Sequence, residues 1–67
     1  MNKAELRSIM VKHGDTDKSL AKYLGISERS FSSKINENGS EFNKREISAI
    51  IKKYGLTEEQ VMIIFFG

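Results

Sequence analysis

Apolar residues recur along this chain at the spacing of an α-helix rather than in the alternation of a β-strand. Two runs follow the i, i+3, i+4, i+7 pattern, namely Leu6, Ile9, Met10 and His13, and Ile47, Ile50, Ile51 and Tyr54. Glycines separate the apolar runs, and glycine readily adopts the left-handed conformation that ends many helices. The pattern predicts five helices, near residues 3–13, 17–24, 28–36, 43–54 and 58–66.

Each predicted helix begins with a suitable N-terminal cap. A capping box places Ser, Thr, Asn or Asp at the cap and Glu or Gln three residues later. The pairs that match are Asn43 with Glu46, Thr57 with Gln60 and Asn2 with Glu5. Ser27 and Thr16 are good caps for the other two helices. The sequence therefore predicts an all-α protein.

The composition limits the classes of function. The 67 residues fit one small domain, and a chain with no Cys and a single His has no disulfide and no Cys- or His-rich metal site. No apolar stretch approaches the roughly 20 residues of a membrane span, and the N-terminus is neither a signal nor a transit peptide. We therefore expect a cytoplasmic binding protein rather than an enzyme, with no cofactor and no membrane association.

Positive charge is concentrated in the first 56 residues. They hold all 11 Lys and Arg residues and seven of the nine acids. Two of the cations, Lys44 and Arg45, fall in the first turn of a predicted helix, where the helix dipole disfavours each by about 0.3–1 kcal/mol. A phosphate bound there would explain this placement, because it would meet unpaired backbone N–H groups and two cations. An incidental pair of solvated side chains is the alternative.

The segment 19–35 has the residue pattern of a helix-turn-helix. Gly25 falls in a tight turn between two short predicted helices, where a positive φ is needed. Ala21 is small where those helices would cross, so their backbones can approach closely. The apolar residues that would fill the space between the helices are Leu20, Leu24, Ile26 and Phe31. Together these are the physical requirements of a helix-turn-helix motif.

These residues resemble the Cro/CI-type (XRE) helix-turn-helix repressors of phages. The resemblance continues through residues 38–42, 46–51, 56–59 and 64–66, so it covers nearly the whole chain. It implies a compact four- or five-helix, lambda-repressor-like DNA-binding domain over residues 1–67, with the motif at about 17–36. The chain looks like the small single-domain regulators of phages and prophages of Gram-positive bacteria, which bind DNA operators, usually as dimers.

Two positions depart from the family pattern. Asp17 stands where many members have Gln in contact with the DNA backbone, and its charge repels phosphate, so Lys18 is the expected substitute. Lys34 stands where the family has an apolar residue three positions after Phe31, and Ile35 is expected to pack instead. This shift predicts a slightly rotated or longer recognition helix.

The predicted helix 28–36 is expected to read DNA with the face opposite Phe31 and Ile35. Arg29 is the first choice, because its guanidinium can pair with both acceptors of guanine. Glu28 either accepts from a cytosine amino group or orients Arg29 through an ion pair. The base-reading candidates are Arg29, Glu28, Ser33 and Ser32; the resemblance points to Ser33, and a solvated helix face accounts for both serines equally well. The candidates for contact with the DNA backbone are Ser27, Lys18, Lys34, Asn38, Ser40, Lys44 and Arg45.

The predicted helix at 58–66 carries six apolar residues in succession, from Val61 to Phe66. A surface helix needs only about half of its circumference to be apolar. Val61, Ile64 and Phe65 can face the core, and Met62, Ile63 and Phe66 then point elsewhere. We expect these three residues to form a homodimer contact, which would serve to read a two-fold-related DNA site. Burial of the whole stretch within one chain is the alternative.

The expected function is that of a transcriptional regulator that binds double-stranded DNA sequence-specifically and acts by operator occupancy. It is expected to associate with the nucleoid of a bacterial host and to need no small-molecule effector. The alternative is a small protein-interaction module of the antirepressor kind, which uses the same fold to bind another regulator. The apolar residues 61–66 suit both functions, whereas Arg29, Lys44 and Arg45 favour DNA.

Overall fold

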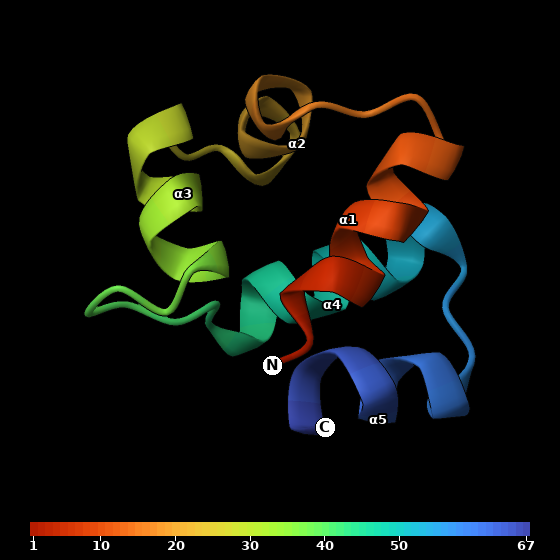
Figure 1. Cartoon of the computed structure of the whole chain (residues 1–67). Coiled ribbons are helices and arrows are strands. Elements are labelled where there is room, and N and C mark those ends of the chain that lie inside the picture. Colours follow the sequence, from red (N-terminus) through yellow and green to blue (C-terminus); the bar gives the residue numbers. More distant parts are fainter.

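The computed structural model describes all of residues 1–67 and contains five α-helices and no strand (Figure 1). The helices are α1 (Lys3–Lys12), α2 (Asp17–Leu24), α3 (Glu28–Ile35), α4 (Lys44–Tyr54) and α5 (Glu58–Phe66). The all-α prediction is confirmed, and each predicted helix is present with ends that differ by at most one residue. The differences fall at His13, Asn36 and Asn43, which are cap residues at the edge of their helices.

Side-chain caps begin the helices, as the sequence predicts. Asn43 and Glu46 form a reciprocal capping box on α4, and Thr57 forms one with Gln60 on α5. Ser27 caps α3 by accepting the N–H three residues later. These contacts satisfy backbone N–H groups that have no partner inside the helix.

At the two remaining helix starts the predicted cap residue is confirmed, but the partner of one of them differs from the prediction. Thr16 caps α2 in a full capping box in which Ser19 takes the place of Glu or Gln. Asn2 caps α1 by accepting the Glu5 N–H at 3.1 Å, but the Glu5 side chain does not return the contact. The Asn2 N–H instead donates to the carbonyl oxygen of Ile64 at 2.6 Å. The predicted box at Asn2 is therefore wrong, because a tertiary contact with α5 supplies the backbone partner.

Twelve buried apolar side chains form one core, to which all five helices contribute. The members with no exposed surface are Leu6, Leu20, Phe31, Ile50 and Ile64. Phe31 lies against Phe42, with ring centroids 5.6 Å apart. His13 is at the exposed end of α1, where its ring lies 4.8 Å from that of Tyr54. It therefore ends the apolar stripe of α1 at the edge of the core.

α2 and α3 pack closely across a tight turn. Gly25 has a φ of 75°, and the next residue, Ile26, donates its N–H to the carbonyl oxygen of Ala21 at 3.0 Å. Ala21 is buried, in agreement with the predicted close approach of the two helices. Figure 1 shows α3 at the edge of the molecule, followed by the 36–43 loop, which extends outward before the chain returns as α4.

The last helix, α5, divides its apolar residues between the core and the solvent. Ile64 is fully buried and Phe65 is half-buried, whereas Met62, Ile63 and Phe66 are exposed. This division is the predicted one, and we refer to Met62, Ile63 and Phe66 as the apolar α5 face. No helix in this protein combines the length and the apolarity that crossing a membrane would require.

Candidate nucleic-acid interface

The first turn of α3 presents an unpaired cation and an unpaired acid to solvent. Glu28 and Arg29 are both exposed, and neither takes part in an ion pair. Glu28 therefore does not orient Arg29, which was one of its two expected roles. Phe31 and Ile35 are buried on the other side of the helix, as predicted. The Arg29 guanidinium is thus available to a ligand outside the protein.

The serines in and before α3 differ in how far their oxygens are already engaged. Ser27 Oγ accepts the Ser30 N–H at 3.1 Å as the helix cap. Asn36 Nδ2 donates to the Ser32 carbonyl oxygen at 2.9 Å and lies 3.4 Å from the Ser32 hydroxyl. Ser33 is half-buried, and its hydroxyl makes no hydrogen bond to another side chain. Of the two serines among the base-reading candidates, Ser33 keeps the more available hydroxyl.

The first turn of α4 carries two further unpaired cations. Lys44 and Arg45 are exposed and make no ion pair. On the loop before them, Asn38 is exposed and Ser40 is half-buried. The side chain of Asn43 is occupied as the cap, where it accepts the N–H of the third helical residue at 2.8 Å. α3, the 36–43 loop and the start of α4 lie at the same side of the molecule (Figure 1).

Lys34 has a structural role in place of the expected contact with the DNA backbone. Its Nζ lies 2.8 Å from Oε1 and 2.6 Å from Oε2 of Glu46, whose side chain is buried. Burial raises the pKa of Glu46, but the hydrogen bonds from Lys34 and from the Asn43 N–H outweigh it, so the pKa lies below its usual value. Moving the ammonium to a phosphate would leave a buried carboxylate unpaired. We therefore remove Lys34 from the candidate contacts.

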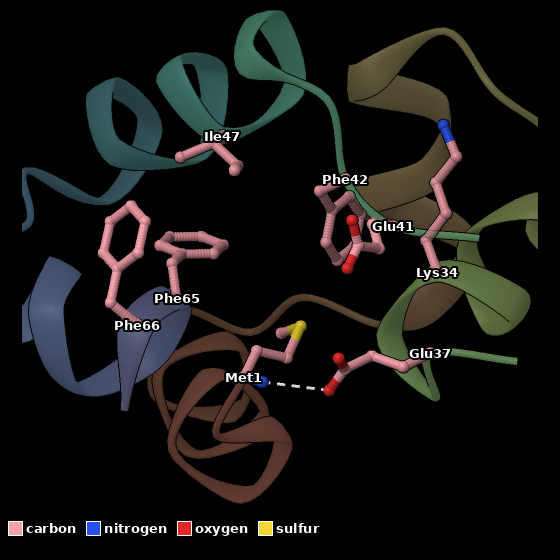
Figure 2. Close-up of a pocket in the computed structure, with 8 residues that line it drawn as sticks. All are labelled: Met1, Lys34, Glu37, Glu41, Phe42, Ile47, Phe65 and Phe66. Atoms are coloured by element: carbon pink, nitrogen blue, oxygen red, sulfur yellow. Dashed lines mark hydrogen bonds and ion pairs between the residues drawn. The ribbon is translucent and has the colours of Figure 1, made fainter. Parts of the chain in front are cut away.

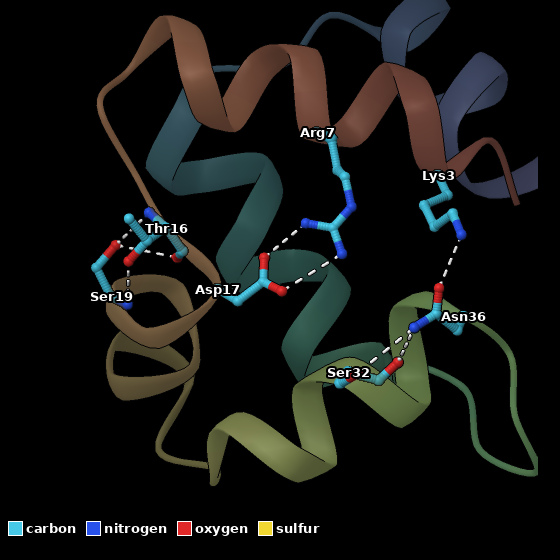
Figure 3. Close-up of polar contacts among 7 residues, drawn as sticks. All are labelled: Lys3, Arg7, Thr16, Asp17, Ser19, Ser32 and Asn36. Atoms are coloured by element: carbon cyan, nitrogen blue, oxygen red, sulfur yellow. Dashed lines mark hydrogen bonds and ion pairs between the residues drawn. The ribbon is translucent and has the colours of Figure 1, made fainter.

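The acid at the start of α2 is paired with a residue that the sequence did not indicate. Arg7 of α1 contacts both carboxylate oxygens of Asp17, at 2.6 and 3.3 Å (Figure 3). Lys18 is exposed and unpaired beside this pair. Lys3, one turn before Arg7, donates to the Asn36 side chain at 2.8 Å (Figure 3). The only sequence signal for these two contacts was the i, i+4 spacing that places Lys3 and Arg7 on one face of α1. Such spacing is also typical of a solvated helix face.

A hollow of about 230 Å³ separates α5 from the 36–43 loop (Figure 2). Its apolar lining consists of Met1, Phe42, Ile47, Phe65 and Phe66, and Lys34, Glu37 and Glu41 complete it. The Met1 amine lies 2.9 Å from Oε1 of Glu37 (Figure 2). Since Phe66 also belongs to the apolar α5 face, that face is continuous with the hollow.

Asp15 is the acceptor at the centre of a second polar cluster, which the sequence did not predict. The hydroxyls of Tyr54 and Ser19 donate to it at 2.6 and 2.8 Å, and Lys53 Nζ lies 3.6 Å away. The hydrogen bond from Tyr54 is the main cause of a lowered pKa at Asp15. Burial, followed by the bond to Asp15, raises the pKa of Tyr54. These contacts tie the α1–α2 connection to the end of α4.

The lowered pKa values of Asp15 and Glu46 predict a loss of stability in acid. Each carboxylate holds its proton less tightly in the folded protein than in the unfolded chain. Its contribution is therefore complete above the unfolded pKa and is lost as the pH falls through the folded pKa. The usual values are 3.8 for Asp15 and 4.5 for Glu46, so the free energy of unfolding should fall below about pH 5.

Urea denaturation between about pH 7 and pH 3 measures this loss. Asp15→Asn should lower the free energy of unfolding at neutral pH and make its decline in acid shallower. A free energy of unfolding that stays level or rises on acidification would contradict the assignment of these two carboxylates.

No three His, Asp or Glu side chains come together where they could hold a metal ion. The surface around the 36–43 loop carries the exposed cations Arg29, Lys44 and Arg45 and also two exposed acids of the loop itself, Glu37 and Glu41. Comparisons of this chain with protein-family models, with curated proteins and with solved structures found no match.

Proposed function

We propose that this protein is a sequence-specific double-stranded-DNA-binding regulator of the Cro/CI type, in which α2 and α3 form the helix-turn-helix and α3 is the recognition helix. The observation that carries the proposal is the presence of exposed, unpaired cations at two helix starts. These cations are Arg29 on α3 and Lys44 and Arg45 on α4. An exposed helix beside a basic helix N-terminus suits a duplex, because the first meets base edges while the second meets phosphates.

In this proposal α3 enters the major groove with its first turn at the base edges. Arg29 donates to O6 and N7 of a guanine. Glu28, which does not pair with Arg29, accepts from a cytosine amino group. Ser33 is the third candidate for base contact, and Ser32, which already accepts from Asn36, is the weakest.

The DNA backbone is held at two places in this proposal. Lys44 and Arg45 bind a phosphate at the start of α4, where the backbone N–H groups also point outward. Lys18 binds a second phosphate at the start of α2, and Arg7 reduces the repulsion that Asp17 would otherwise exert there. Asn38, Ser40 and Ser27 are additional candidates, since their side chains lie in the two loops that flank α3.

The regulator is proposed to act as a homodimer through the apolar α5 face. Met62 is 59% exposed, Ile63 41% and Phe66 68%. Three large apolar side chains on one exposed helix face suit a protein contact better than solvent. A two-fold pair would present two α3 helices about 34 Å apart, one turn of DNA. Occupancy of such an operator then blocks polymerase, at the nucleoid of a bacterial cell.

Binding to another regulator through the same apolar α5 face is the second candidate function. The observation that favours it is the hollow beside Phe66, which an apolar side chain of a partner can enter. Glu41, which makes no ion pair, lines the same hollow and suits a partner with a cation beside that side chain. Neither Arg29 nor Lys44 is needed for this function.

Selection of bound duplexes from a random-sequence DNA pool at about 0.15 M salt tests the proposal. We expect enrichment of one site with two-fold symmetry and half-sites about 10 base pairs apart, centre to centre. Arg29→Ala, selected in parallel, should weaken binding by about 1–3 kcal/mol and relax the preference at one base pair of each half-site.

Each other outcome of the selection has a distinct meaning. Enrichment of a single asymmetric half-site would contradict the homodimer but not the recognition helix. Binding with no enrichment at all would contradict sequence-specific regulation and favour the second candidate function. Sedimentation of the free protein at high concentration then shows whether the apolar α5 face pairs without DNA.

A further inference from the structure

The Lys34–Glu46 pair joins the two helices on either side of the 36–43 loop. One ammonium contacts both carboxylate oxygens, at 2.8 and 2.6 Å. The side chain of Lys34 is 18% exposed and that of Glu46 only 2%. A carboxylate buried to this extent is strongly unfavourable without its partner. The pair is therefore a fixed part of the folded protein.

The carboxylate of Glu46 also makes a second contact, within α4. Its Oε1 also accepts the Asn43 N–H at 2.9 Å, and this contact closes the capping box of α4. The residue that defines the start of α4 is thus also the residue that holds the last turn of α3. As a result, one side chain joins the first turn of α4 to the last turn of α3.

Two backbone hydrogen bonds join the start of the loop to α3, from the Asn38 N–H to the Ser33 carbonyl oxygen at 2.8 Å and from the Glu37 N–H to the Lys34 carbonyl oxygen at 3.2 Å. The backbone of α3 approaches that of α2 closely. Phe31 and Phe42 lie against each other, and apolar ring contacts of this kind tolerate small shifts. Lys34 and Phe42 line the same hollow (Figure 2). The Lys34–Glu46 ion pair joins α3 to the other end of the loop, where α4 begins.

Along the chain, the candidate phosphate contacts of the loop and of α4 fall between Lys34 and Glu46. Asn38 and Ser40 are on the loop, and Lys44 and Arg45 immediately precede Glu46 in the chain. Phosphates occupy fixed positions relative to the base edges, so donors on α4 and readers on α3 must keep one spacing to bind together. The Lys34 ammonium also neutralises a carboxylate that would otherwise repel a phosphate at the start of α4.

We propose that the Lys34–Glu46 pair positions residues 38–45 relative to the recognition helix, so that the base contacts of α3 and the phosphate contacts of α4 form together. The inference rests on the proposed function and adds two positioning residues to it. Neither residue touches DNA, and both act through Lys44 and Arg45.

The double variant Lys34→Met/Glu46→Gln is the appropriate test. This variant removes both charges at once. The side-chain amide oxygen introduced at position 46 can still accept the Asn43 N–H. Replacement of a buried ion pair by neutral residues of similar volume commonly leaves a protein folded. Lys22→Met, at an exposed residue of α2 with no ion pair, is the matched control. Lys34→Arg should behave like the unaltered protein, because a guanidinium can contact both carboxylate oxygens.

Amide hydrogen exchange of the free protein tests whether the pair holds the loop. The reporter is the Asn38 N–H, which donates to the Ser33 carbonyl oxygen at 2.8 Å and contacts neither member of the pair. In the double variant we expect this amide to exchange at least about tenfold faster. The Ile26 N–H, in the turn between α2 and α3, should exchange at an unchanged rate. Unchanged exchange at Asn38 would overturn the positioning role.

Equilibrium binding to the selected operator and to a scrambled duplex tests the link to DNA. When the two proteins are compared at equal concentrations of folded protein, we expect the double variant to lose about tenfold in affinity for the operator and much less for the scrambled duplex. Operator affinity equal to that of the unaltered protein, despite faster exchange at Asn38, would show that the pair serves the fold alone. If the unaltered protein selects no DNA site, the proposed function itself fails, and the exchange result still decides whether the pair holds the loop.

Discussion

Phe31→Ala is expected to leave much of this protein unfolded in water at 25 °C. Phe31 is fully buried, and it packs against Phe42 from the 36–43 loop. Truncation of a buried Phe costs about 3–5 kcal/mol, through lost transfer energy and the cavity left behind. A chain of 67 residues has a total stability of only about 3–10 kcal/mol. The expected loss is therefore comparable with the whole free energy of unfolding.

Urea denaturation followed by far-ultraviolet circular dichroism measures this effect. Phe31→Leu, which keeps most of the apolar volume, should remain folded with a smaller loss of about 1–2 kcal/mol. Val11→Ala is the control, because Val11 is 75% exposed and its truncation should change the stability by less than about 0.5 kcal/mol. If Phe31→Ala unfolds at the same urea concentration as Val11→Ala, Phe31 is not the packing centre that its burial indicates.

Lys44→Ala/Arg45→Ala is expected to give the largest loss of DNA affinity at full stability. The magnitude of the salt-dependence slope should decrease by about 0.9, because the two cations bind one phosphate and each neutralised phosphate contributes about 0.9. Binding should weaken similarly on all sequences, since phosphates carry no base identity. The variant should be no less stable than the unaltered protein, because cations in the first turn of a helix are disfavoured by about 0.3–1 kcal/mol each.

Lys12→Ala/Lys52→Ala is the matched control for these two cations. It removes the same charge from two exposed last-turn positions, on α1 and α4. Lys52 lies about 12 Å along the axis of α4 from Lys44. We expect the salt-dependence slope of this control variant to stay within about 0.5 of the slope of the unaltered protein. Equal slopes for the two double variants would remove Lys44 and Arg45 from the DNA interface.

The sequence predicted those features of the fold that depend on residues within four positions of each other. The capping contacts of Asn43, Thr57, Ser27 and Thr16 all join a cap to the residue three positions later. Helical periodicity, which is also local, places Phe31 and Ile35 on the buried face of α3 and Arg29 on its exposed face. For this reason the five helices and the exposed face of α3 were predictable.

Contacts between helices could not be predicted in this way. Lys34 is one of several lysines on predicted helix faces, and nothing in its neighbourhood selects Glu46, 12 residues away, as its partner. Arg7 and Asp17 pair across 10 residues, and Tyr54 and Asp15 across 39. Each pairing depends on how the helices pack, which local spacing does not encode.

The same division applies to the candidate interface. Side-chain chemistry and helix position were enough to select Arg29, Lys44 and Arg45, because a helix start in solvent has the same electrostatics in any fold. Only the tertiary structure decided that Lys34 is paired inside the protein, that Arg7 offsets Asp17, and that Asn2 is tied to α5. The reason is physical: the partner of a charge or of a backbone N–H is set by distance in space, and burial decides whether that partner can be exchanged for a ligand.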